Sequence, residues 1–269
     1  MTKESPSKYY FNQSVFCSQC HRLRYMGYTY GEDLLCQCSD QKNVKTYIKM
    51  TTEQKIEAIK EAIEKAKNHQ SKMDEIAWSV PALSSIILRH LMNNLGAIST
   101  HYMEHGTHLG GIFCSVLRNN PNIEIAWWGD SFASDKVTGE NVEEKFMQNA
   151  IKCIQGTDTV LLGEVSDTFD LPGDFGNTVD LYCFDADHSY ESQRKAMIHF
   201  LPSMADTFIV CVDDWQYGDV KRGTIDGILD SGCDILFQEE LLNPEPYTED
   251  QHLNDLYWRG FYIALLKKK

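Results

Sequence analysis

The sequence predicts an α/β fold in which a doubly wound, mostly parallel sheet of seven strands carries helices on both faces. From about residue 100 onward, short apolar runs alternate with stretches of helical periodicity, the pattern of strand–helix–strand crossover units. Two of these runs, which end at Phe184 and Val212, are followed directly by acidic residues. Ligands of open parallel sheets bind beyond the carboxyl ends of the strands, so these acids are expected at a binding site.

Length and composition bound the class of protein. A chain of 269 residues with 42% hydrophobic residues is long enough for one large domain, or one domain with an appendage. A net charge of −14 repels polyanions and so disfavours a general nucleic-acid binder. No apolar run reaches the length of a membrane span, and the start, "MTKESPSKYY", lacks a signal-peptide core. We therefore expect a cytoplasmic protein that does not act at a membrane.

The first fifty residues, 1–50, are expected to form a cysteine-rich module. Four of the nine cysteines lie in it: Cys17, Cys20, Cys36 and Cys38. Four thiolates can close a tetrahedral Zn²⁺ site, which would stabilise a segment too small to bury much core. The first pair has the usual Cys-x2-Cys spacing, whereas the second is Cys-x-Cys, and His21 could replace one ligand. The alternative is four reduced surface thiols.

Residues 51–98 are expected to form a helical lead-in. "TTEQ" predicts a capping box with Thr51 as the N-cap and Gln54 three residues later. A second helix is predicted from Pro81, which suits a first turn, to Gly96, which suits a helix end.

Residues 99–269 carry the predicted sheet. Seven apolar runs are expected to be its strands: 101–105, 123–129, 159–163, 179–184, 207–212, 233–237 and 260–266. Helical patterns lie between most of them, at His108–Arg118, Val142–Ile154, Ser189–Leu201 and Val220–Asp230.

The first two strand ends have the residues of a nucleotide site. "MEHGTHLGG" places Glu104, Gly106 and Gly110 where a strand turns into a helix, and glycines there let the backbone approach a ligand at a helix N-terminus. Asp130 follows the second strand, where an acidic residue commonly holds ribose hydroxyls. The alternative for Asp130 is a turn or cap residue.

Four motifs in one order, "YMEHGTHLGG", "WWGDSF", "FDADHSYES" and "FIVCVDDW", resemble the class I S-adenosylmethionine-dependent methyltransferases. The likeness is greatest to the metal-dependent sugar and small-molecule O-methyltransferases, including the macrocin O-methyltransferase-like enzymes. It covers roughly residues 80–269 and implies a Rossmann-like fold, S-adenosylmethionine as cofactor and a small-molecule hydroxyl acceptor, such as a sugar. His105 departs from the family, which has an aliphatic residue there. The resemblance implies these cofactor-binding residues: Glu104, Gly106, Thr107, Gly110, Asp130, Ser131 and Asp185.

The chemistry of the last two motifs is consistent with this resemblance. Asp185, Asp213 and Asp214 would bring three mutually repelling carboxylates to one point, where Mg²⁺ is the natural partner. A hydroxyl bound to that ion loses its proton more easily, and His188 or Asp187 could accept the proton. The alternative is that these acids only cap the following helices.

Two other functions stay open at this stage. One is a metal-independent methyltransferase of nucleic acid or protein that uses the zinc module to bind its substrate. The other is a non-enzymatic interaction protein built on a methyltransferase scaffold, although such a scaffold has no need of the acidic strand ends.

Overall fold

A computed structural model of the chain describes residues 14–16, 23–25, 50–132, 141–154, 159–162, 178–243, 257 and 259–269. The four cysteines of the predicted zinc site lie outside these residues, so that site stays a prediction. None of the helices in the described part of the chain combines the length and the apolar content needed to cross a membrane.

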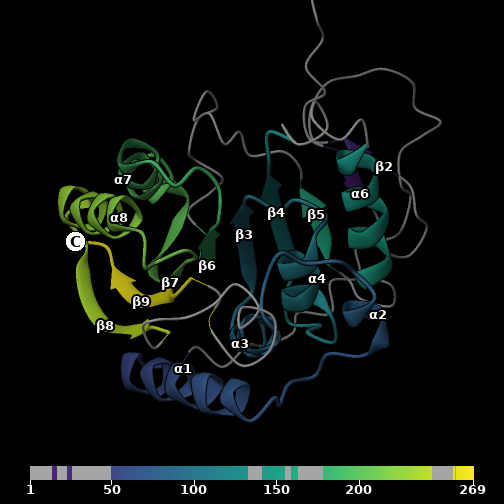
Figure 1. Cartoon of the computed structure of the whole chain (residues 1–269), viewed down its shortest axis with the longest axis horizontal. Coiled ribbons are helices and arrows are strands. Elements are labelled where there is room, and N and C mark those ends of the chain that lie inside the picture. Colours follow the sequence, from purple (N-terminus) through teal and green to yellow (C-terminus); the bar gives the residue numbers. More distant parts are fainter. Residues whose placement is uncertain are drawn as a thin grey trace, which may run out of the picture.

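The molecule is built on one twisted sheet (Figure 1), with strand order β2-β1-β5-β4-β3-β6-β7-β9-β8. The strands are β1 Ser14–Phe16, β2 Leu23–Tyr25, β3 His101–His105, β4 Ile125–Gly129, β5 Val160–Leu162, β6 Val179–Phe184, β7 Met204–Val212, β8 Asp234–Leu241 and β9 Phe261–Lys267. Strands β5, β4, β3, β6 and β7 are parallel, and β9 is antiparallel to both β7 and β8. Each predicted apolar run overlaps one of β3 to β9. The predicted count of seven is wrong, because β1 pairs with β5 and β2 with β1.

Helices cover both faces of the sheet. They are α1 Thr52–Lys67, α2 Glu75–Trp78, α3 Ile86–Gly96, α4 Gly111–Leu117, α6 Val142–Cys153, α7 Tyr190–His199 and α8 Gly218–Ser231, with a 3-10 turn at Leu201–Ser203. Side chains of a strand point alternately to its two faces, and the core divides accordingly. Ile209 and Cys211 of β7 pack with α1, α3, α4 and α6, whereas Val210 and Val212 pack with α7 and α8. In Figure 1, α7 and α8 lie together, apart from α1, α3 and α4.

The helical lead-in is confirmed at one end and corrected at the other. Thr51 caps α1 through the predicted capping box with Gln54. The second helix was predicted from Pro81, and that start is wrong. Helix α3 begins at Ile86, because the hydroxyl of Ser85 accepts the amide N–H of Leu88 at 3.2 Å and caps the helix there. The preceding residues are therefore free to approach the carboxyl edge of the sheet.

Candidate active site

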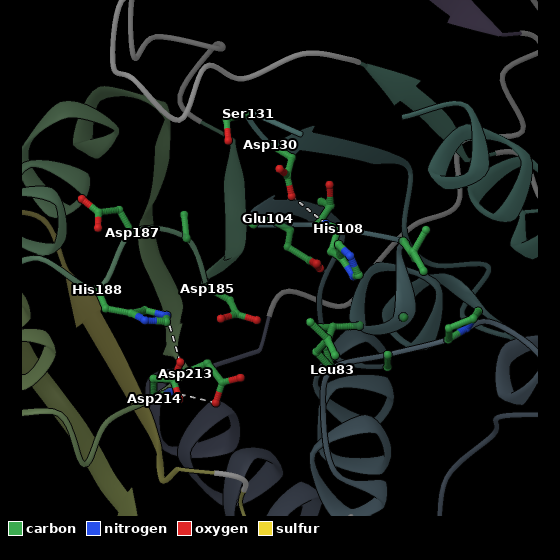
Figure 2. A pocket seen from close by; sticks show the side chains of 18 of the residues that line it. Leu83, Glu104, His108, Asp130, Ser131, Asp185, Asp187, His188, Asp213 and Asp214 are labelled. Atoms are coloured by element: carbon green, nitrogen blue, oxygen red, sulfur yellow. Dashed lines mark hydrogen bonds and ion pairs between the residues drawn. The ribbon is translucent and has the colours of Figure 1, made fainter. Parts of the chain in front are cut away.

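A pocket of about 510 Å³ opens at the carboxyl ends of β4, β3, β6 and β7 (Figure 2). The parallel strands all end at this edge, so the residues after them converge although they are far apart in the sequence. The predicted site residues that line it are Glu104, Gly106, Thr107, Asp130, Ser131, Asp185, Asp187, His188, Asp213 and Asp214. Among the described residues, the predicted Gly110 is not part of its wall.

The glycine turn after β3 is packed directly against the end of β6. Gly106 has φ +87°, and a Cβ atom there would lie 1.6 Å from the carbonyl oxygen of Asp185. The amide N–H of Asp185 donates to the carbonyl of His105 at 2.8 Å. Gly110, with φ +86°, is instead the N-cap of α4. Glycine is thus required at 106 by close approach and by backbone conformation together.

Asp130 connects the first two strand ends. Its Oδ2 accepts the amide N–H of His108, and its Oδ1 accepts that of Phe132, both at 2.7 Å. The turn role considered as an alternative is therefore present. Each carboxylate oxygen can accept a second hydrogen bond, and Asp130 lines the pocket, so the ribose role stays a compatible prediction.

Glu104 is buried on β3, and the hydroxyl of Tyr102 donates to its Oε2. Burial raises the pKa of Glu104 to about 8, against the lowering effect of that hydrogen bond. This carboxyl group is therefore largely protonated at neutral pH and adds little negative charge to the pocket.

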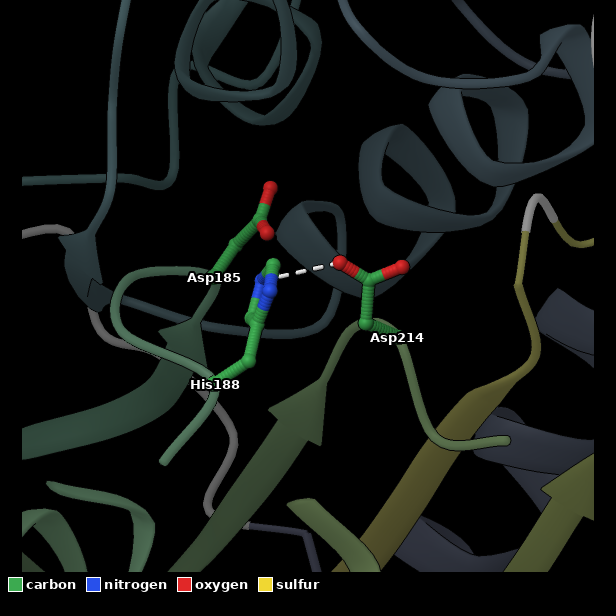
Figure 3. A group of neighbouring side chains, drawn as sticks. All are labelled: Asp185, His188 and Asp214. Carbon is green, nitrogen blue, oxygen red and sulfur yellow. Dashed lines mark ion pairs between the residues drawn. The ribbon is translucent and has the colours of Figure 1, made fainter. Parts of the chain in front are cut away.

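The other end of the pocket holds a compact group of three side chains (Figure 3). Asp185, His188 and Asp214 each offer a ligand atom, and these atoms lie within 4.8 Å of one another. His188 Nε2 lies 2.8 Å from Asp214 Oδ2. Asp214 Oδ1 is buried and has no hydrogen-bond partner in the described part of the chain. We call Asp185, His188 and Asp214 the acid–imidazole group.

Negative charge is poorly compensated at this end. Burial, together with Asp213 and Asp214, raises the pKa of Asp185 well above its usual range. Burial and the Asp214 carboxylate raise the pKa of Asp213 to about 8. The hydrogen bond to Asp214 raises the pKa of His188, which favours the charged form of the imidazole beside these carboxylates.

The other two predicted residues of this end are placed differently. Asp213 lines the pocket, but its Oδ1 accepts the amide N–H of Asp214 at 2.9 Å, and it is not a member of the acid–imidazole group. Asp187 is exposed, and its carboxylate accepts the hydroxyl of Ser189 at 2.7 Å. Figure 2 shows the Asp187 carboxylate turned away from Asp185.

Nine of the residues that line the pocket were not predicted as site residues, among them Leu83 and Arg259. Leu83, 65% exposed, stands at the wall opposite the acids, and Arg259 precedes β9. Trp215, which follows the two aspartates after β7, is 1% exposed and stacks on Tyr262 with 4.1 Å between ring centroids, so it is a packing residue.

Comparison with known protein families shows which kind of domain the residues around this pocket resemble. A family model described as a methyltransferase domain matches residues 84–215, which run from the start of α3 through the turn after β7. These residues are similar to a methyltransferase domain. The match and the sheet order support the expected S-adenosylmethionine-dependent methyltransferase with a Rossmann-like fold. No curated protein matches the chain at a significant level.

Two solved structures show what the chain is similar to. An O-methyltransferase from Bacillus cereus in complex with SAH is 12% identical, with a TM-score of 0.46, over 82% of this chain and 94% of that one. M. jannaschii TYW2 in complex with AdoMet is 9% identical, with a TM-score of 0.47, over 72% and 81%. These similarities are low, so the assignment of the domain rests on the family match.

Proposed function

We propose that the protein transfers the methyl group of S-adenosylmethionine to a hydroxyl of a small molecule, such as a sugar, beside a divalent cation. The observation that carries this proposal is the acid–imidazole group, at one end of a pocket whose other end is the glycine turn after β3. Methyl transfer needs the two reactants side by side, and holding them in line supplies much of the rate enhancement.

The donor atoms at this end fit a divalent cation. Mg²⁺ binds through a few carboxylate oxygens, and Asp185 and Asp214 offer them from two neighbouring strand ends. The buried Asp214 Oδ1, which has no partner among the described residues, would gain one. Asp213 lines the same pocket and is kept as a further candidate ligand.

A divalent cation, when bound, lowers the pKa of a coordinated hydroxyl. The side chains of the protein would supply the base and hold the two reactants in position. His188 is the favoured base, because its hydrogen bond to Asp214 holds the imidazole ring at the edge of the pocket. Asp187 is the alternative base, although its carboxylate is turned toward Ser189. Glu104, largely protonated, and Asp130, tied to two backbone amides, leave the cofactor end free of strong uncompensated charge.

Calorimetry and thermal unfolding test both parts of the proposal. S-Adenosylhomocysteine at about 100 times its Kd should stabilise the protein by about 2.7 kcal/mol. In Asp130→Ala most of this gain should be lost, because the His108 amide loses its anchor and the ribose loses its predicted acceptor. Asp219→Ala, an exposed change on α8, is the control and should keep the full gain.

Mg²⁺ or Mn²⁺ should add a further stabilisation to the cofactor-loaded protein, which a chelator reverses. A parent protein that millimolar S-adenosylhomocysteine does not stabilise would refute the cofactor assignment. If the protein binds S-adenosylhomocysteine but neither cation stabilises it further, the result would favour the alternative of a metal-independent methyltransferase.

A further inference from the structure

The pocket contains one arginine amid acidic side chains, besides the imidazoles of His108 and His188. Among the described residues that line it, Arg259 is the only lysine or arginine. The acidic lining residues are Glu104, Asp130, Asp185, Asp187, Asp213 and Asp214. A guanidinium group in such surroundings would be expected to pair with a carboxylate. In the described part of the chain, however, Arg259 forms no ion pair with any of them.

The position of Arg259 follows from the direction of β9. An antiparallel strand begins at the edge where its parallel neighbours end, so the residues before Phe261 meet the turn after β7. The amide N–H of Trp215 donates to the carbonyl of Gly260 at 3.1 Å, and that of Gln216 donates to the carbonyl of Arg259 at 2.8 Å. The backbone of Arg259 is therefore fixed beside the Asp213–Asp214 turn.

The side chain of Arg259 is held by Tyr217. Its Nη1 donates to the Tyr217 hydroxyl, and its guanidinium carbon lies 5.2 Å from the centre of the Tyr217 ring. The same ring stacks on His188, with centroids 5.6 Å apart and planes 22° apart. Arg259 thus lies one aromatic ring beyond the imidazole of the acid–imidazole group. Its planar fork has further N–H donors, and within the described part of the chain these form no other hydrogen bond. Its positive charge also opposes the rise in the pKa of Asp213.

The order of the strands shows which of the two reactants would lie beside the guanidinium group of Arg259. Along the carboxyl edge, the glycine turn follows β3 and Asp130 follows β4, whereas Arg259 adjoins β7 and β9. Strand β6, which Asp185 directly follows, lies between these two ends. Arg259 is therefore at the acceptor end, on the far side of the acid–imidazole group from the cofactor turn.

We propose that Arg259, held by Tyr217, binds an oxyanion on the acceptor, so that the substrate is a hydroxylated acid bearing a carboxylate or a phosphate. This rests on the proposed function and narrows it. Arginine binds both anions through two parallel N–H···O bonds, which fix orientation as well as add affinity. An acid held at Arg259 would present a hydroxyl to the acid–imidazole group across the Tyr217 ring. Acceptors without the acidic group would lack that second anchor.

Matched pairs of probes test this on the full chain loaded with S-adenosylhomocysteine and Mg²⁺. The pairs are 3,4-dihydroxybenzoate with its amide, glucuronate with glucuronamide, and glucose 6-phosphate with glucose. Calorimetry should show at least one acid binding about 10- to 100-fold more tightly than its neutral partner, the range for a charge-assisted hydrogen bond. The pair that responds separates a carboxylate from a phosphate ligand.

Arg259→Gln should abolish that preference, whereas Arg222→Gln, an exposed arginine on α8 paired with Asp219, should keep it. The proposal is overturned if no acid binds more tightly than its neutral partner, including no binding at all, in a protein that binds S-adenosylhomocysteine. It is also overturned if Arg259→Gln weakens S-adenosylhomocysteine instead, because the arginine would then serve the cofactor carboxylate. Failure of the parent protein to bind S-adenosylhomocysteine would count against the proposed function itself.

Discussion

The two ends of the pocket are built on opposite principles. At the cofactor end, polar groups are already paired: both oxygens of Asp130 accept backbone amides, and Glu104 accepts the Tyr102 hydroxyl. At the acceptor end, Asp214 keeps a buried oxygen without a partner among the described residues, and burial raises the pKa of Asp185. One end is complete within the chain, and the other, under the proposed function, would hold a cation that offsets its charge.

The two ends of the pocket therefore contribute to the stability of the fold with opposite sign. Hydrogen-bonded turns add to stability, whereas buried carboxylates that repel one another subtract from it. Substitutions at the two ends should therefore change stability in opposite directions. The first two of the following predictions test that contrast, and the third concerns the pH dependence of the buried Glu104.

The largest effect is expected where the two ends touch. Gly106→Ala places a Cβ atom against the Asp185 carbonyl at a φ of +87°, so the turn and the end of β6 must separate. We expect a loss of about 3 kcal/mol or more in the free energy of unfolding, measured with denaturant. Gly218→Ala is the matched control: it has no neighbour within 4 Å, and its stability should be unchanged or slightly higher. Equal effects at both glycines would show that the contact with Asp185 is unimportant.

A gain is expected at the acceptor end. Asp213→Asn keeps an oxygen for the Asp214 amide but removes a buried charge whose pKa is raised to about 8. At pH 8 without divalent cations, the variant should be more stable by about 1–2 kcal/mol. Its additional stabilisation by Mg²⁺ should be smaller than that of the parent protein. A loss of stability at pH 8 would contradict the view that this end is electrostatically strained.

The smallest effect is a change in pH dependence. The folded-state pKa of Glu104 is about 8, above its usual value, so the stability that this group contributes is present at low pH and is lost as pH rises through 8. Below pH 6.5, His90 and His105 act in the opposite direction, because burial lowers their pKa values to about 4 and about 3.

Unfolding should therefore be compared between pH 6.5 and 8.5. Glu104→Gln keeps an acceptor for Tyr102, and its fall in stability over this range should be smaller by about 1 kcal/mol. Parallel curves for the two proteins would mean that Glu104 is ionised in the folded state throughout.

Local patterns in the sequence were enough to find the strands and the acids at their ends. In the run "FIVCVDDW", the apolar residues indicate a buried strand, and the two aspartates indicate a polar turn after it. The apolar residues are in β7, and the aspartates are in the turn that follows it. Contacts that depend on strand order could not be found this way. Arg259 reaches the pocket only because β9 runs antiparallel beside β7. The pairing of His188 with Asp214 likewise depends on two loops that meet in space.

The start of α3 shows a different limit. Pro81 and Ser85 are both good residues for a helix start, and the sequence does not say which is used. The tertiary structure favours Ser85, because a Cβ atom at Gly111 would lie 2.2 Å from the Cβ atom of Ala82. Residues 81–83 are thereby held against α4 and line the pocket.

The place of β9 in the sheet has a consequence for biosynthesis. It lies between β7 and β8 but is made after both, so the apolar edge of β7 has no partner until residue 261 onward has left the ribosome. At roughly 5–20 residues per second, that interval lasts on the order of seconds. The turn that carries Asp213 and Asp214 gains its hydrogen bond from Trp215 to Gly260 only then. The acceptor end is thus the last part of the pocket to form, and a nascent chain that stalls before β9 presents an open strand edge to chaperones and to its neighbours.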